Sequence, residues 1–276
     1  MTTPLIEKLN ITSSVSIVII SISLMLFGGF AMTRITKRLR LPNVTAYIVA
    51  GILMGPYCLN LIPIGLIERM DFIADIALAF IAFSTGEFFR FSTLKKSGVK
   101  VLLITFLEAC LASIAVFIAT HYVLGLNMVF SVVLATAPAS TMMTIRQTHA
   151  KGDFVDTLLQ VVALDDVVGL VAYSIAISIA LASMTGNFQA QNVLRPIIMN
   201  LFAFALGGVF GLILKFLLHK RSTDNRLIVS IALLFAFCGI CALMGVSSLL
   251  GCMSMSMIYI NTSDDERLFK QLNYFS

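Results

Sequence analysis

Residues 158–172 form the run Leu-Leu-Gln-Val-Val-Ala-Leu-Asp-Asp-Val-Val-Gly-Leu-Val-Ala, an apolar stretch interrupted by two adjacent aspartates, Asp165 and Asp166. An ionisable residue inside a bilayer costs about 2.5–3.5 kcal/mol on insertion scales, so acids in such a run are candidates for function. Counted from Asp156, nine or ten helical residues reach about 14 Å, near the middle of a bilayer core about 30 Å thick. Adjacent residues point about 100° apart around a helix, so the two carboxylates meet different environments.

The composition places the whole chain in a membrane. Of 276 residues, 59% are hydrophobic and only 12% are charged, about half of the roughly 25% usual in soluble domains. Too few polar residues are present to cover a soluble surface, which excludes a soluble globular protein, a disordered chain and a disulfide scaffold. At about 28–30 residues per crossing and loop, the length allows about nine transmembrane helices.

The hydropathy pattern agrees with that estimate and shows no soluble domain. Apolar stretches lie at about 14–33, 44–62, 70–86, 99–120, 128–147, 157–183, 193–214, 226–244 and 246–261. The first lacks a small-residue cleavage site and is followed by a basic run, so we interpret it as a retained helix rather than a signal peptide. The sequence therefore predicts an all-α integral membrane protein whose residues 1–276 form one transmembrane domain of about nine helices.

The basic residues are distributed unevenly between alternate loops. Sixteen of the 19 lysines and arginines fall on one side of the predicted membrane, and only Lys8, Arg69 and Arg195 fall on the other. Basic loops mark the cytoplasmic face, so we expect the N-terminus outside and the C-terminus in the cytoplasm. The net charge of +5 is thus a topology signal, and we expect the bilayer, not nucleic acid, as the partner.

The fifth stretch carries a second signal. Pro138 lies in mid-span among hydroxyl residues, namely Thr136, Ser140 and Thr141. Proline removes a backbone donor and frees a carbonyl, while the hydroxyls offer oxygens to an ion or to the loosened backbone. Pro138 is nine residues before the cytoplasmic turn and Asp165 nine residues after it, so both have about the same depth. A broken helix beside mid-membrane acids is typical of cation sites in secondary transporters; the alternative is a simple proline kink.

Other residues give weaker signals. Glu108, inside the fourth stretch, is a possible core acid. The five cysteines lie in or beside apolar stretches, and although Cys238 and Cys241 form a C-x-x-C pattern, we interpret them as small buried hydrophobic residues. The glycine pairs Gly51-x-x-x-Gly55 and Gly207-x-x-x-Gly211 predict close helix packing.

Together, these motifs resemble a known family. Three stretches are similar to motifs of the bacterial monovalent cation:proton antiporters, the sodium/hydrogen exchanger-domain proteins. They are Ala135-Thr-Ala-Pro-Ala-Ser-Thr141 with Arg146-Gln147, Ala163-Leu-Asp-Asp-Val-Val-Gly-Leu170, and Leu41-Pro-Asn-Val-Thr-Ala-Tyr-Ile-Val-Ala-Gly-Ile-Leu-Met-Gly-Pro56. The likeness extends from about Arg34 to the C-terminus. The resemblance implies a homodimeric secondary transporter in the plasma membrane, working by alternating access, with a monovalent cation and protons as substrates, no cofactor and no enzymatic activity.

The resemblance also implies roles for individual residues. Asp166 would be the shared cation and proton carboxylate. Asp165 would accompany electrogenic exchange and pair with a lysine of the second repeat, and Thr136 would lie at the unwound segment of the broken helix. The glutathione-gated potassium branch carries Gln-Asp at the acid pair, whereas this chain has Asp-Asp, which favours the sodium-type branch.

The length departs from the family pattern. In that family two inverted repeats make the transport unit, and the acid pair closes the first repeat, here residues about 14–183. Residues about 193–261 would link to and begin a second repeat that stays incomplete, so we expect a C-terminally truncated antiporter. Two alternatives remain open: a sodium-coupled organic-solute symporter of related architecture, and a truncated chain that does not transport.

Overall fold

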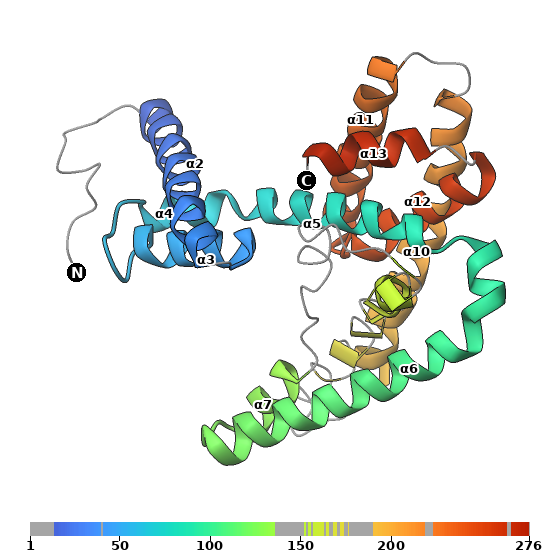
Figure 1. Ribbon diagram of the computed structural model, residues 1–276, viewed down its shortest axis with the longest axis horizontal. Coiled ribbons are helices and arrows are strands. Elements are labelled where there is room, and N and C mark those ends of the chain that lie inside the picture. The colour runs from blue at the N-terminus through green and yellow to red at the C-terminus, as the bar shows by residue number, and fades with distance from the viewer. Residues whose placement is uncertain are drawn as a thin grey trace. The chain divides into compact units, whose positions relative to one another are not determined.

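The computed structural model (Figure 1) describes residues 14–39, 41–135, 190–218, 223–263 and 266–275, together with 152, 154–155, 157–162, 164–165, 168–169, 172–173 and 176. These residues form helices and contain no strand, which confirms the all-α class. The chain divides into two compact units, one of residues 1–74 and 141–150 and the other of residues 75–140 and 151–276.

The first unit is built on a pair of neighbouring helices. α2 (Ser14–Arg38) packs on α3 (Asn43–Met54), and the side chain of Met54 lies directly against Gly28. Within α2, the hydroxyls of Thr33 and Thr36 donate to backbone carbonyls of the preceding turn. This satisfies their hydrogen bonds without water, as a helix in hydrocarbon requires.

The stretch expected at 44–62 is not one continuous helix. α3 ends at Met54, where Gly55 adopts an extended conformation before Pro56, because a residue preceding proline is disfavoured in the helical region. A turn follows, in which Asn60 has a φ of +48°, and the short α4 (Ile64–Arg69) comes next. The apolar run is therefore a helix of 12 residues followed by a turn.

Among the described residues, four helices are long and apolar enough to cross a bilayer: Val15–Arg38, Gly98–Val123, Leu194–Leu218 and Asn225–Met244. They match four of the nine expected stretches. α5 (Asp71–Thr85) and α12 (Leu249–Ser263) match two more but are shorter. The described part of the chain thus confirms a multi-pass helical protein without establishing a count of nine.

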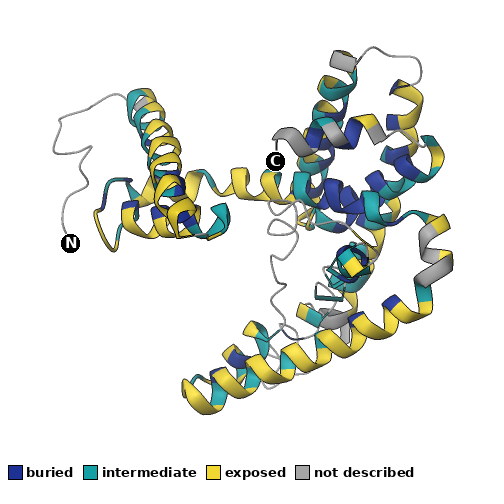
Figure 2. Cartoon of the chain, in the orientation of Figure 1, coloured by how far each residue is buried: buried dark blue, intermediate teal, exposed yellow. Residues whose placement is uncertain are grey.

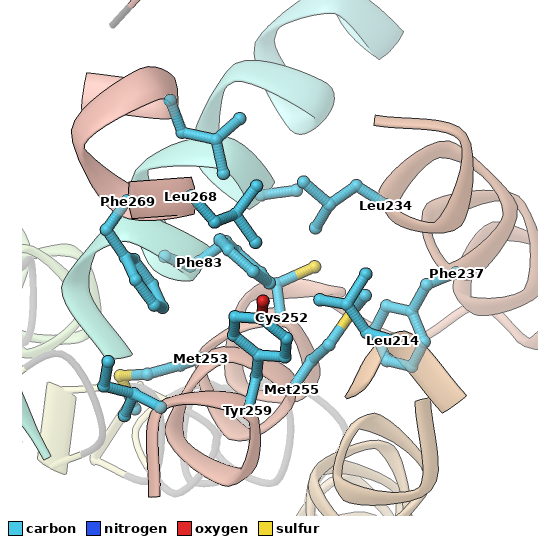
Figure 3. Close-up of a cluster of buried hydrophobic side chains, with 14 of the residues drawn as sticks. Phe83, Leu214, Leu234, Phe237, Cys252, Met253, Met255, Tyr259, Leu268 and Phe269 are labelled. Carbon is cyan, nitrogen blue, oxygen red and sulfur yellow. The ribbon is translucent and has the colours of Figure 1, made fainter. Parts of the chain in front are cut away.

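The core of the second unit surrounds α12. Nine residues of α12 are buried, and they pack with residues of α5, α10 (Ala190–Leu218), α11 (Thr223–Met244) and α13 (Glu266–Phe275). Figure 3 shows this cluster, in which Tyr259 and Met255 of α12 lie among Phe83, Leu214 and Phe237. By contrast, α6 (Phe91–Ile118) is mostly exposed along its length (Figure 2), and its exposed side chains are largely leucine, isoleucine, valine and phenylalanine.

Glycines bring α10 and α12 into close contact. A Cβ added at Gly207 would lie 2.6 Å from the carbonyl carbon of Gly251, and one added at Gly211 would lie 3.1 Å from the Cβ of Ile258. The packing expected for Gly207 and Gly211 is thus confirmed. Gly51, by contrast, has no described atom within 4 Å of such a Cβ, so the expectation of close packing there is wrong for the described residues.

An asparagine fixes the bend between α5 and α6. After α5, a short 3-10 turn, η1 (Gly86–Phe88), leads into α6. The amide nitrogen of Asn261, on α12, donates to the backbone carbonyl of Phe89 at 2.8 Å, and its oxygen accepts from the backbone N–H of Phe91 at 2.7 Å. One side chain therefore holds both sides of the bend against α12.

The last helix was not expected from hydropathy. α13 is short and amphipathic, with Leu268, Phe269 and Leu272 at 0–3% exposure. The ring of Phe269 stacks on Phe83 with centroids 5.5 Å apart. The segment after α12 thus packs its apolar face into the core of this unit.

Candidate functional site

Asp165 lies in a helical stretch of the second unit. Leu159, Gln160 and Val161, one turn earlier, are each no more than 7% exposed. Consecutive residues of a helix point about 100° apart, so these three residues are buried over about half of the helix circumference, while Leu158 and Val162 on the other side are half-buried. Asp165 itself is half-buried.

Two observations describe the surroundings of Asp165. Its neighbour Leu164 packs against the cluster around α12, and the charge of Asp165 acts on Glu108 of α6. Leu164 therefore lies against the α12 cluster. Of the acids that the sequence indicated, the charges of Asp165 and Glu108 interact.

Glu108 is exposed on α6 and Asp165 is half-buried, and two like charges that interact make a negative potential around them. Each disfavours the charge of the other, and a cation or a proton relieves that repulsion. Carboxylates that interact in this way can bind a monovalent cation and a proton in competition, which is the chemistry that the Asp165-Asp166 pair predicts.

Gln160 was missed by the sequence reasoning. It is 5% exposed, and its side-chain oxygen has no hydrogen-bond partner among the described residues. Buried amides are nearly always paired, so an amide oxygen one turn before the acids is a candidate polar group of the site. The available signal was that Gln160 is the one polar residue between Leu158 and Leu164.

The remaining predicted site residues lie outside the described part of the chain. These are Asp166, Thr136, Pro138, Ser140 and Thr141. α7 (Met128–Leu134) covers only the beginning of the fifth apolar stretch, with Asn127 as its N-cap. The broken helix therefore stays a prediction.

Comparison with known proteins identifies the class of this chain. The family model of the sodium/hydrogen exchanger transmembrane domain matches residues 9–276. The chain belongs to this family, whose members are membrane transporters for monovalent cations and protons.

A curated relative is similar over a shorter region. A probable Na(+)/H(+) antiporter 3 from Methanocaldococcus jannaschii is 26% identical over 111 residues, which is 40% of this chain. The matched region covers 28% of the relative's length.

Proposed function

We propose that the chain exchanges a monovalent cation, preferably Na+, for protons across the plasma membrane by alternating access, with Asp166 as the shared cation and proton site. The observation that carries this proposal is the family match over residues 9–276. The Asp165-Asp166 pair in an apolar run and the proximity of Glu108 to Asp165 support it.

The proposed mechanism is a competition of charges. A deprotonated Asp166 binds a dehydrated cation, assisted by Asp165 and by oxygens near Thr136. Protonation of Asp166 removes that charge and releases the cation, so one site serves both ions in turn. Because the cation and the proton never occupy the site together, each inward step of one is coupled to an outward step of the other.

Glu108 has a supporting part in this proposal. Its negative charge near Asp165 raises the local concentration of cations without contacting the bound ion. Replacing it with glutamine is expected to weaken the apparent cation affinity while leaving coupled exchange intact. Replacing Asp166 is expected to abolish exchange.

The test is proton flux in vesicles reconstituted with the chain and a pH-sensitive dye. A sodium gradient should drive proton movement with wild type and not with Asp166→Asn, because asparagine can neither take up a proton nor carry the charge. Glu68→Gln is the matched control, since Glu68 is an exposed acid on α4 and its loss should leave the flux unchanged.

Three results would contradict the proposal. Exchange by Asp166→Asn at the wild-type rate would exclude the single-site mechanism. Uptake that needs an organic solute and persists without a proton gradient would identify a sodium-coupled symporter. A folded wild-type chain without any flux would identify a chain that does not transport by itself. Repeating the assay with Li+ and K+ gradients tests the preference for Na+.

A further inference from the structure

The turn between α6 and α7 carries no charge. A single π-helical turn, η2 (Ala119–Val123), continues α6, and residues 124–127 lead from it into α7. From residue 109 to residue 145 the sequence contains no aspartate, glutamate, lysine or arginine. Loops that enter water are mostly polar, so this composition is unusual for a loop in water.

The backbone of the turn pairs within itself. The backbone N–H of Leu124 donates to the carbonyl of Ala119, and that of Leu126 donates to the carbonyl of Thr120, each at 3.0 Å. Gly125 has a φ of +64°, a left-handed conformation that costs glycine little, and the chain reverses its direction here. Two hydrogen bonds therefore close the end of α6 without water.

The polar side chains of the turn bond to neighbouring backbone groups. The Nδ1 of His121 donates to the carbonyl of Leu126 at 3.0 Å; a carbonyl only accepts, so Nδ1 carries the proton. The hydroxyl of Thr120 donates to the carbonyl of Val116 at 2.8 Å, and the side chain of Asn127 accepts from the first turn of α7. A backbone at membrane depth requires internal pairing of this kind, because hydrocarbon offers no partners.

The exposed side chains of the turn are large and apolar. Tyr122, Val123 and Leu124 are 74%, 77% and 67% exposed. They continue the exposed apolar side chains along α6 (Figure 2), the helix whose span of Gly98–Val123 is long and apolar enough to cross a bilayer. The apolar surface of this spanning helix therefore extends over the turn.

The depth of the turn follows from the length of α6. Lys100 is the last basic residue at the predicted cytoplasmic end of this helix, and Val123 lies 23 residues further on. Along the membrane normal, 1.5 Å per residue gives a rise of about 35 Å, which exceeds the hydrocarbon core of about 30 Å but not the full bilayer of about 40–45 Å. The turn is therefore level with the boundary between acyl chains and headgroups, where tyrosine is enriched.

We propose that the turn between α6 and α7 is an anchor in the bilayer leaflet opposite the basic loops, with Tyr122, Val123 and Leu124 inserted between the phospholipid headgroups and the upper acyl chains. The partner is the phospholipid surface itself, which takes up apolar side chains and needs no charged residue to hold it.

His121 seals this anchor. Its ring stacks on Phe117 with centroids 5.5 Å apart and meets the ring of Tyr122 edge-on at 4.9 Å. The imidazole that pairs the carbonyl of Leu126 thus also supports the inserted tyrosine. A buried or lipid-facing carbonyl without a partner is costly, so the seal keeps the turn in the lipid.

An anchored turn fixes where α7 begins. α7 starts at Met128 and leads toward Pro138 of the predicted broken helix. Any movement of that broken helix then takes place relative to an end held at the membrane surface. The anchor depends on insertion into lipid and not on transport, so it stands or fails separately from the proposed function.

The experiment places a single tryptophan at the turn, since the chain contains none. The full chain with Tyr122→Trp is reconstituted in phosphatidylcholine vesicles. Its emission is quenched either by iodide present on both sides of the membrane or by lipids brominated high or low on the acyl chains. We expect a blue-shifted emission, weak quenching by iodide and the strongest quenching by lipids brominated near the headgroup.

Two matched variants calibrate the measurement, each replacing an exposed apolar residue. Leu111 is 66% exposed and lies about 16 Å beyond Lys100, near the bilayer midplane, so lipids brominated deep in the chains should quench Leu111→Trp most. Phe154 is 78% exposed and lies among charged residues of the connection before Asp165, so iodide should quench Phe154→Trp and brominated lipids should not.

Three results would overturn the proposal. Iodide quenching of Tyr122→Trp equal to that of Phe154→Trp would place the turn in water. Quenching by neither agent would show that protein covers the turn, and a pattern like that of Leu111→Trp would place it too deep. Should Tyr122→Trp fail to fold, Leu124→Trp repeats the measurement at the same turn.

A second variant tests the seal. His121→Ala, combined with the Leu124→Trp reporter, leaves the carbonyl of Leu126 without its partner. Iodide quenching of the reporter should then rise and quenching by brominated lipid should fall, because the unpaired carbonyl draws the turn toward water. Unchanged quenching would refute the role of His121 in the anchor.

Discussion

At the scale of single residues, Asn261 shows how one polar side chain organises a membrane helix bundle. It accepts from Phe91, and it donates to Phe89 and, at 2.7 Å, to Met257 of its own helix. These bonds pair backbone groups at the bend after η1, where the helix ladder is interrupted. Unpaired backbone groups are costly away from water, so the asparagine offsets the cost of the bend.

We expect Asn261→Ala to lower the stability of the protein by about 2 kcal/mol, because it leaves the backbone groups of Phe89 and Phe91 without their partner. The measurement is thermal unfolding of the protein in detergent. Thr262→Ala is the control, since the Thr262 hydroxyl bonds only to carbonyls of α12 itself. Equal melting temperatures for the two variants would show that Asn261 does not hold the bend.

The candidate site also belongs to the residue scale. The sequence predicts Asp165, Asp166 and Glu108 as candidate site acids because the cost of a charge in hydrocarbon is a local property of each residue. The interaction between the charges of Glu108 and Asp165 could not be predicted, since 57 positions separate them in the chain and no local pattern relates the two helices. Gln160 was missed because an amide carries no charge.

At the scale of elements, the packing of α10 on α12 depends on glycine. A Cβ at Gly207 would collide with the backbone of Gly251, which cannot move aside as a flexible side chain can. Backbone proximity of this kind lets helices associate where hydrophobic burial provides no driving force, because the surrounding lipid is equally apolar.

We expect Gly207→Ala to destabilise the protein by about 1–3 kcal/mol, as overpacked cores do. Gly239→Ala on α11 is the matched control. Gly239 has no described atom within 4 Å of an added Cβ, so alanine there should be neutral or stabilising by up to about 1 kcal/mol through its helix propensity. The stabilities are compared by chemical or thermal unfolding in detergent. An equal loss of stability in the two variants would refute the close contact between Gly207 and Gly251.

At the scale of the whole molecule, α13 ties the last described residues to the core of the second unit. We expect Phe269→Ala to cost about 3–5 kcal/mol, the range for a buried phenylalanine, because its ring stacks on Phe83 and lies near Tyr259. Phe216→Ala is the control of the same type, since Phe216 is 82% exposed. Protease sensitivity of the C-terminal region, together with the melting temperature, reports the effect. Equal protease sensitivity and equal melting temperatures for the two variants would show that α13 does not pack on the core.

The orientation in the membrane is a second prediction at this scale. The uneven distribution of basic residues predicts that Cys58, an exposed thiol in the turn after α3, reacts with a membrane-impermeant maleimide added to intact cells. A cysteine introduced by Ser222→Cys, between α10 and α11, should react only after the membrane is permeabilised. The opposite labelling pattern would show that the chain has the opposite orientation in the membrane.

The amino-acid sequence by itself determined the class of this protein and its main apolar helices, and it predicts Asp165, Asp166 and Glu108 as candidate site acids. Each of these depends on transfer free energies and periodicities that are summed over neighbouring residues, and neighbours are visible in a sequence. Tertiary structure alone decided that Asn261 holds a bend 170 residues away, that α10 packs on α12 through Gly207 and Gly251, and that α13 is a core helix. These depend on which segments meet in space, and such contacts between distant parts of a chain leave no local periodicity.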